Sequence, residues 1–345
     1  MTTSRRLPAT VLVSAFIAAV SMMGCSRDEP AVGLFLYNEA DPYIKEFAKQ
    51  IMEESGTVFT PVQYDAGNSQ LIQNEQLEGL LVRNPALVIV NPVDRLSSHS
   101  VLRKLQAAGI PGIFFNREPL AGDLALWEKS YYVGAKAEQS GQLQAQLVMQ
   151  LFGGEPGNLN GYDRNDDGRI QVIILKGEQG HQDAEIRTRE VLRSFEAAGF
   201  IVEVLALEIA NWNRDEAYAK MGPLLKDYRN NVELVVSNND AMALGAISMM
   251  RQTGMFQDSN RNGRIDRADE LWIPVVGIDG LKEAEAAIAE GYLYGTVKND
   301  SLSMAKAIVE LSGILLGHID PSMAQYPVED GTYIWIDYRP FISEQ

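Results

Sequence analysis

The sequence has almost no cysteine, fewer basic than acidic residues and no long hydrophobic run. These shortages argue against disulfide bonds, a nucleic-acid partner and a membrane-spanning helix, respectively. Cys25 is the only cysteine among 345 residues, so no disulfide framework can stabilise the fold. Lysine and arginine number 30 against 46 acidic residues, a formal net charge of −16, which repels phosphate backbones and argues against a nucleic-acid partner. The apolar stretch Ala9–Met23 is too short to span a bilayer comfortably. The remaining composition is that of a globular protein, and the length suits two domains.

The N-terminus has the layout of an export signal. Arg5 and Arg6 precede the apolar stretch, which ends in Met22-Met23-Gly24-Cys25. This ending resembles a lipobox, in which a lipoprotein signal peptidase cleaves before a diacylated cysteine; an ordinary secretory signal is the alternative. We expect residues 1–24 to be a signal peptide, Cys25 to carry a lipid, and 25–30 to be a tether. The mature chain would then be anchored to a membrane of the cell envelope, on its periplasmic or extracytoplasmic side.

Apolar segments typical of buried strands alternate with helical patterns along the rest of the chain. Strands are expected at Val32–Tyr37, Val58–Val62, Ala86–Val90, Ile113–Phe115, Val172–Leu175, Ile201–Leu205, Leu234–Val236, Ile273–Ile278 and Tyr292–Val297. Helices are expected, among other places, at Tyr43–Glu54, Glu185–Ala198, Glu216–Lys226, Ala241–Gln252 and Ser303–Leu315. This alternation predicts parallel βαβ units, too many for one small sheet. The sequence therefore predicts an α/β protein with two doubly wound domains.

Polar side chains follow six of the expected strands. They are Asp41, Asn116, His181 with Asp183, Asn239, Asp279 and Asn299. Ligands of open α/β sheets bind beyond the carboxyl ends of the strands. Each of these residues alone is better explained as a helix cap or turn former, but their repetition favours a binding site. Planar carboxylates and amides can each engage two neighbouring hydroxyls, which is what a sugar requires.

Further residues fit a sugar site. Asp183 and Arg187 are spaced i, i+4, so the guanidinium can hold the carboxylate and also donate to a ligand; a surface salt bridge is the alternative. Trp212 lies in a loop and Tyr43 follows Asp41. Aromatic rings above and below the apolar face of a pyranose would complete the site, although core packing explains Trp212 equally well.

Two long loops have the spacing of calcium ligands. The first, Asp163–Gln171, matches the first nine positions of an EF-hand loop, with ligands at Asp163, Asn165, Asp167, the Arg169 carbonyl and Gln171, and a glycine at position six. Its twelfth position lies inside a strand, so a remote carboxylate is needed. The second loop, Asp258–Glu270, offers Asp258, Asn260, Asn262, the Arg264 carbonyl, Asp266 and Asp269, with Glu270 just after. For this loop, calcium and a merely solvated acidic loop are equally plausible.

Five short motifs stand out along the chain: Phe114-Phe-Asn-Arg-Glu-Pro119, Tyr131-Tyr-Val-Gly134, Leu175-Lys-Gly-Glu-Gln-Gly-His-Gln-Asp-Ala-Glu185, Ser237-Asn-Asn-Asp-Ala-Met242 and Gly295-Thr-Val-Lys-Asn-Asp300. With these motifs the chain resembles, from about Val32 to about Tyr338, the periplasmic galactose/glucose-binding proteins of ABC sugar importers. The resemblance implies the type I periplasmic binding protein fold, with two lobes joined by a three-segment hinge. The lobes are expected at 31–135 with 299–331, and at 136–298 with 332–345.

The resemblance also implies a function and its residues. The family's sugar ligands fall on Asp41, Asn116, His181, Asp183, Arg187, Asn239, Asp279 and Asn299, and its stacking aromatics fall on Tyr43 and Trp212. Its calcium loop falls on Asp163–Gln171, with Glu233 as the remote carboxylate. The expected protein is a monomer that binds D-glucose or D-galactose and hands it to an ABC permease. Tyr43 stands where the family has Phe, Pro42 replaces a polar residue, and no family pattern covers the second loop.

Other functions compete with transport. A glycoside hydrolase would use two of Asp41, Asp183 and Asp279 as its carboxylates, but each has a plausible binding partner, so we expect no enzyme. A lac-repressor-type regulator would need an N-terminal helix-turn-helix where the export signal lies. A receptor that signals to a chemoreceptor or sensor kinase stays open, as does the preference between glucose and galactose.

Overall fold

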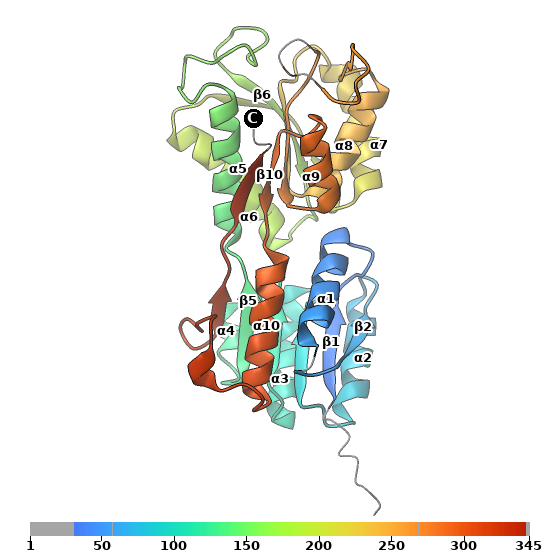
Figure 1. Ribbon diagram of the computed structural model, residues 1–345, viewed down its shortest axis with the longest axis vertical. Coiled ribbons are helices and arrows are strands. Elements are labelled where there is room, and N and C mark those ends of the chain that lie inside the picture. The colour runs from blue at the N-terminus through green and yellow to red at the C-terminus, as the bar shows by residue number, and fades with distance from the viewer. Residues whose placement is uncertain (1–30, 57, 266, 268–269, 343–345) are drawn as a thin grey trace, which may run out of the picture.

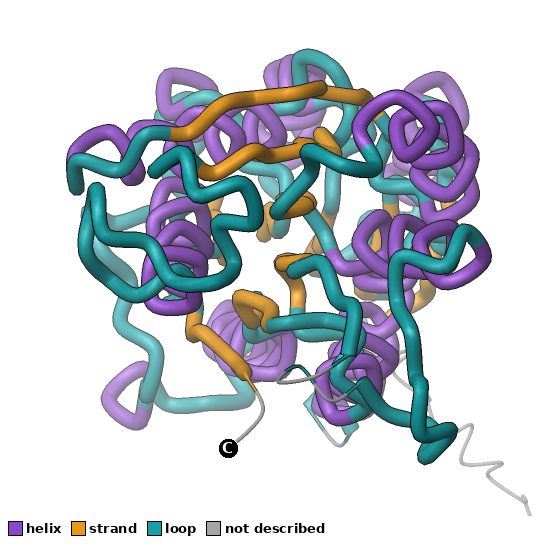
Figure 2. The backbone as a smooth tube through the Cα atoms, turned by 90° about the horizontal axis from the view of Figure 1, so that it is seen from above, coloured by secondary structure: helices purple, strands orange, loops and turns teal. Residues whose placement is uncertain are grey.

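The chain folds into two α/β lobes stacked along its long axis (Figure 1). The computed structural model describes residues 31–56, 58–265, 267 and 270–342. Cys25 and the expected signal peptide and tether at 1–30 lie outside these residues. Each lobe contains one six-stranded sheet, with helices on both sides of the strands (Figure 2). The predicted fold class, two doubly wound lobes, is confirmed.

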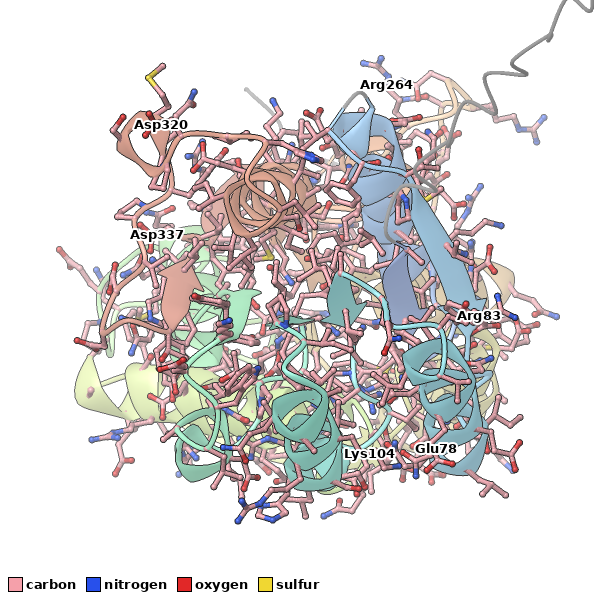
Figure 3. The ribbon with its side chains drawn as sticks, turned by 90° about the horizontal axis from the view of Figure 1, so that it is seen from below. Glu78, Arg83, Lys104, Arg264, Asp320 and Asp337 are labelled. Carbon is pink, nitrogen blue, oxygen red and sulfur yellow. The ribbon has the colours of Figure 1, made fainter. Side chains whose placement is uncertain are left out.

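The first lobe holds a fully parallel sheet in the order β11-β5-β4-β3-β1-β2. Its strands are β1 Val32–Leu36, β2 Pro61–Asp65, β3 Leu87–Val90, β4 Gly112–Phe115, β5 Ser130–Gly134 and β11 Tyr333–Trp335. Its helices are α1 Pro42–Ser55, α2 Gln70–Leu81, α3 Ser98–Ala108, α4 Ala121–Leu124 and α10 Ser301–Leu315. On the outer surface an exposed ion pair of 2.6 Å joins Glu78 of α2 to Lys104 of α3 (Figure 3).

The second lobe has the order β12-β10-β9-β8-β6-β7, with β12 antiparallel to β10 and the other pairs parallel. Its strands are β6 Ile170–Lys176, β7 Val202–Ile209, β8 Leu234–Ser237, β9 Val275–Asp279, β10 Gly295–Lys298 and β12 Arg339–Ile342. Its helices are α5 Ala137–Leu151, α6 Gln182–Ala197, α7 Arg214–Tyr228, α8 Asp240–Gln252 and α9 Lys282–Ala289.

The chain passes between the lobes three times, after β5, after β10 and after β11 (Figure 1). The third crossover corrects the expected lobe boundary at 331/332. Tyr333–Trp335 pair with β5 in the first lobe, and the chain enters the second lobe only at β12. Short edge strands such as β11 carry too little apolar pattern to be assigned from sequence.

Alternating side chains build a core on both faces of the first sheet. Val32, Leu34 and Leu36 of β1 pack with α1 and α10, whereas Phe35 packs on the opposite face with residues of α2 and α3. One strand was predicted too early: Val58 and Phe59 donate backbone hydrogen bonds to the Ser55 carbonyl at the end of α1, so β2 begins only at Pro61. Within the described ranges, no helix is long and apolar enough to cross a membrane.

Candidate functional site

The ends of the two sheets face each other across a small cavity between the lobes. All ten residues expected to bind a sugar line it, together with Tyr37, Ile44 and Arg117. The ten are Asp41, Tyr43, Asn116, His181, Asp183, Arg187, Trp212, Asn239, Asp279 and Asn299. The cavity measures about 30 Å³, room for about two water molecules. A ligand as large as a sugar therefore requires the lobes to part.

Asp41 is both a helix cap and part of the cavity wall. Its Oδ1 accepts hydrogen bonds from the backbone N–H groups of Tyr43 at 2.8 Å and Ile44 at 3.2 Å, and Pro42 begins α1. Its Oδ2 accepts a short hydrogen bond from the Tyr37 hydroxyl. From sequence a helix cap and a cavity residue are alternatives, but Asp41 is both, because α1 starts at the cavity.

Arg117 is a wall residue that the sequence prediction missed. Its guanidinium lies 3.9 Å from the centre of the Tyr37 ring, donates to the Val93 carbonyl and forms a 3.2 Å ion pair with Glu178 of the other lobe. Tyr37 is a second cavity residue that the sequence prediction missed. Both residues lie near predicted strand ends: Tyr37 ends the first predicted strand, and Arg117 directly follows Asn116. Arginine and tyrosine at strand ends are therefore also candidates for the lining of such a cavity.

Arg187 of α6 is the most heavily bonded side chain of the site. It is 4% exposed, and its Nη1 donates to the Asn238 carbonyl at 2.7 Å and its Nη2 to the Tyr338 hydroxyl at 3.0 Å. Asp183 lies 3.4 Å and Asp279 3.8 Å from its guanidinium. The pair with Asp183 is therefore buried at the cavity, which removes the surface salt bridge as an explanation.

Burial shifts the pKa values of three ionisable groups in the site. Burial raises the pKa of Asp183 and of Asp279, while the Arg187 cation lowers both. Burial lowers the pKa of His181 well below its usual value, and Arg117 and Arg187 lower it further. The neutral His181 caps α6 by accepting the Asp183 N–H at Nδ1, 3.1 Å. Its remaining nitrogen, Nε2, then carries the proton and is a donor.

The two aromatic residues come from opposite lobes. Trp212 packs edge-on against His181, with ring centres 5.1 Å apart, and a Cβ at Gly177 would lie 2.3 Å from the indole, so only glycine leaves room for it. Tyr43 of α1 packs edge-on against Phe47, 5.9 Å between centres. Both residues line the central cavity, one from each lobe.

Two features of the cavity residues mark a ligand site. Arg187 Nε and Asn299 Oδ1 are buried and have no hydrogen-bond partner, whereas buried polar atoms are nearly always paired. Asn116, Trp212 and Asp279 have φ values of 61°, 62° and 127°, a region that disfavours side chains and collects at functional sites. The strain and the unpaired atoms lie in the same cavity.

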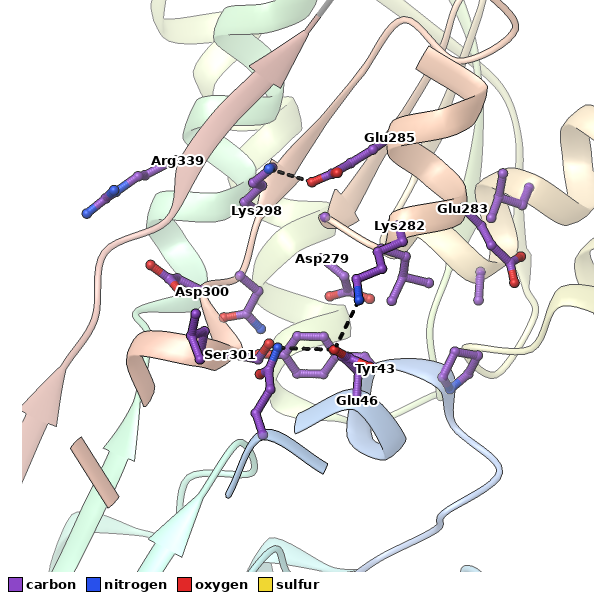
Figure 4. Close-up of a pocket in the computed structure, with 18 of the residues that line it drawn as sticks. Tyr43, Glu46, Asp279, Lys282, Glu283, Glu285, Lys298, Asp300, Ser301 and Arg339 are labelled. Atoms are coloured by element: carbon purple, nitrogen blue, oxygen red, sulfur yellow. Dashed lines mark hydrogen bonds and ion pairs between the residues drawn. The ribbon is translucent and has the colours of Figure 1, made fainter. Parts of the chain in front are cut away.

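A larger cavity of about 600 Å³ adjoins the central one and shares Tyr43, Asp279 and Asn299 with it. Its sides belong to both lobes: Glu46 of α1 pairs with Lys282 of α9 at 3.7 Å, and Lys298 pairs with Glu285 (Figure 4). At another rim Gln182 donates to Glu118 at 3.0 Å. The Glu46–Lys282 and Gln182–Glu118 contacts join lobe to lobe beside the central cavity and must break if it opens, whereas Lys298 and Glu285 both belong to the second lobe.

The first candidate calcium loop is folded around its acidic side chains. Asp163 accepts from the N–H groups of Asp167 and Gly168, Asn165 from Asp167, and Asp167 from Arg169. Glu233, 1% exposed, reaches the loop by accepting from the N–H groups of Arg164 at 2.6 Å and Gln171 at 3.3 Å. Gln171 Oε1 is buried without a partner.

The second candidate loop repeats this pattern. Asp258 accepts from Asn262 and Gly263, Asn260 from Asn262, and Asn262 from Arg264. Glu270 accepts from Ser259 and Asn260, which is the position that Glu233 takes in the first loop. Asp266 and Asp269 lie outside the described residues. No group of three or more His, Cys, Asp or Glu side chains suited to a metal occurs among the residues described.

The chain is similar to known solute-binding proteins over most of its length. The periplasmic binding protein domain family matches residues 32–318. The D-galactose/methyl-galactoside binding periplasmic protein MglB of Haemophilus influenzae is 32% identical over 89% of this chain and 88% of its own. A Bacillus halodurans ABC transporter solute-binding protein with bound myo-inositol is 26% identical, with a TM-score of 0.73 over 91% of this chain and 94% of that one. An Actinobacillus succinogenes ABC transporter solute-binding protein with bound D-allose shares the fold at 19% identity, TM-score 0.72, over 91% and 97%.

All three comparisons agree: the family match over residues 32–318, the identity to the Haemophilus protein and the two-lobed fold. The similar proteins are solute-binding proteins, which contradicts the glycoside hydrolase alternative. The chain belongs to the type I periplasmic binding proteins of sugar ABC importers, and it is the sugar-binding component of such a transporter rather than an enzyme.

Proposed function

We propose that the protein binds a hexose, D-glucose or D-galactose, by closing its lobes around the sugar and delivers it to an ABC permease. One observation carries the proposal: ten polar and aromatic side chains from both lobes converge on one cavity, where Arg187 Nε and Asn299 Oδ1 lack partners. Asp and Asn side chains would take the ring hydroxyls in pairs, and Tyr43 and Trp212 would cover the two ring faces. The name of the Haemophilus relative supports galactose.

Calorimetric titration with a panel of cyclic polyols tests this proposal. The panel holds D-glucose, D-galactose, D-allose, D-ribose, L-arabinose and myo-inositol, the last because a similar structure contains it. We expect glucose or galactose to bind most tightly. Tighter binding of a pentose or of inositol would contradict the hexose assignment and leave the sugar-binding role intact.

Removal of the Trp212 ring is expected to weaken hexose binding by about 1–3 kcal/mol, because a large buried aromatic contact is lost. Calorimetry on Trp212→Ala measures the loss, and Trp212→Phe should restore part of it. Trp127→Ala is the matched control, since this tryptophan packs in the first lobe, away from the cavity. Near-wild-type affinity of a folded Trp212→Ala protein would make the residue a packing residue only.

We also propose that the loop Asp163–Gln171 holds a calcium ion. Its ligands would be Asp163, Asn165, Asp167, Gln171 and Glu233, with the Arg169 carbonyl. Two observations fit a cation: the unpaired Gln171 Oε1, and Glu233, whose pKa is raised by burial and further by Asp163. When bound, the ion would supply positive charge that offsets both effects and join the loop to the start of β8.

The repeated pattern of the second loop supports a further calcium ion there, with Asp258, Asn260, Asn262 and the Arg264 carbonyl as ligands. We assign Glu270 the role proposed for Glu233 in the first loop.

We further propose that Cys25 carries a lipid anchor, on the basis of the sequence Met22-Met23-Gly24-Cys25 alone. A chemoreceptor as a second partner of the closed lobes is compatible with transport.

A further inference from the structure

Asp240 is a buried carboxylate that lies behind the candidate sugar site. Its side chain is completely inaccessible, at 0% exposure, and it is absent from the lining of the central cavity. It begins α8 directly after the cavity residue Asn239. A buried carboxylate is costly unless surrounding donors satisfy it, so its partners indicate its role.

Three donors satisfy Asp240, and all come from segments that carry cavity residues. Oδ2 accepts from the backbone N–H of Gly280 at 2.7 Å and of Leu281 at 2.9 Å, the two residues that follow Asp279. Oδ1 accepts from the Thr296 hydroxyl at 2.7 Å, on the strand that leads to Asn299. One carboxylate thus connects three segments that carry cavity residues: the start of α8 next to Asn239, the turn after Asp279, and the strand β10 that precedes Asn299.

The turn that follows Asp279 needs such a support. Asp279 has φ 127°, a conformation that persists in a non-glycine residue only when surrounding contacts impose it. A Cβ at Gly277 on β9 would lie 2.1 Å from Asp240 Oδ1. Glycine at that position therefore leaves the space that the carboxylate occupies beneath the turn.

We propose that Asp240 is a positioning residue, whose carboxylate holds the turn 279–281 so that Asp279 faces the ligand. Its link through Thr296 ties the same turn to the strand that supports Asn299. That the ligand is a sugar rests on the function proposed above, but the dependence of the turn on Asp240 does not.

The charges around Asp279 give this role a measurable signature. Burial raises the pKa of Asp279; Arg187 lowers it, and Asp240, Asp41 and Asp183 raise it. Burial raises the pKa of Asp240 itself to about 7, against the lowering effect of Thr296, the two turn amides and Arg187. A change in the charge of Asp240 acts directly on the two backbone N–H groups that donate to its carboxylate, so the response of these amides to pH reports the contact.

Calorimetric titration of D-galactose and D-glucose at neutral pH separates positioning from general stability. Asp240→Ala leaves the turn amides without an acceptor and is expected to bind at least about tenfold more weakly. Asp240→Asn keeps an acceptor for these amides and should restore binding to near wild-type level. A role in stability alone would lower the melting temperature of Asp240→Ala and leave the affinity of the folded protein unchanged. Wild-type affinity of a folded Asp240→Ala protein, or an Asp240→Asn protein that binds as weakly as Asp240→Ala, would overturn the proposal.

A second readout needs no ligand. In ¹⁵N-labelled protein, the amide protons of Gly280 and Leu281 should follow the titration of Asp240 in wild type, stop doing so in Asp240→Asn, and exchange faster in Asp240→Ala. Gly317 in the first lobe is the control amide. If wild type binds no hexose, the proposed function fails while these amides still decide the role of Asp240. Unchanged amides in both variants would refute that role whatever the ligand.

Discussion

Replacing Arg187 by alanine is expected to weaken hexose binding by about 2–5 kcal/mol, because it leaves buried carboxylates without their cation. Arg187 lies between Asp183 and Asp279 and is itself held by Asn238 and Tyr338. Asp183→Asn should cost a similar amount, since the guanidinium then loses its charged neighbour in α6. Calorimetric titration with the best hexose of the panel measures both losses.

Arg193→Ala is the matched control for Arg187→Ala. Arg193 is an exposed arginine of the same helix, so its loss should leave affinity and melting temperature almost unchanged. Wild-type affinity in folded Arg187→Ala and Asp183→Asn proteins would show that the sugar binds away from this pair. A double-variant cycle would then give no coupling between the two positions.

Removal of calcium is expected to lower the melting temperature by several degrees. A ligand that binds only the native state stabilises it by about 2.7 kcal/mol at a concentration one hundred times its Kd. The first loop bridges distant parts of the chain through Glu233, so its ion should account for most of the effect. Thermal unfolding with and without a chelator, and metal analysis after dialysis against trace calcium, measure this.

Glu233→Gln gives the sharper test, because its effect on the melting temperature should depend on whether calcium is present. In the presence of calcium the variant lacks a charged ligand and should melt below wild type. In chelator the variant should melt at the same temperature as wild type or above it. Burial raises the pKa of Glu233, so its negative charge destabilises the calcium-free fold at neutral pH. Glutamine removes that charge. A variant that melts below wild type in chelator as well would argue for a hydrogen-bonding role without metal.

The second loop is tested by stoichiometry rather than by melting. Two ions per chain in wild type and one in Asp258→Ala or Glu270→Gln would support its proposed ion. The candidate ligands of this loop are all local, so the melting temperature should change little. One ion in wild type, unaffected by Asp258→Ala, would eliminate the second ion, and none would eliminate both.

The sequence by itself determined the features that depend on residues close together in the chain. Alternating apolar segments predicted the two doubly wound lobes, because strand and helix periodicities are local. Polar residues at strand ends predicted the lining of the cavity, because parallel strands of one sheet deliver their carboxyl ends to one edge. The two loops showed their candidate ligands by spacing alone.

Only the tertiary structure decided matters that depend on what packs against a residue. Spacing places Asp183 and Arg187 on one helix face, but burial against Asn238 and Tyr338 distinguishes a cavity pair from a surface pair. Tyr333–Trp335 joined the first lobe because a three-residue edge strand takes its place from β5, its partner. Asp240 resembled any first-turn acid until its donors, from two segments far along the chain, were placed around it. Burial and hydrogen-bond partners are set by chain segments remote in sequence, and no local pattern encodes them.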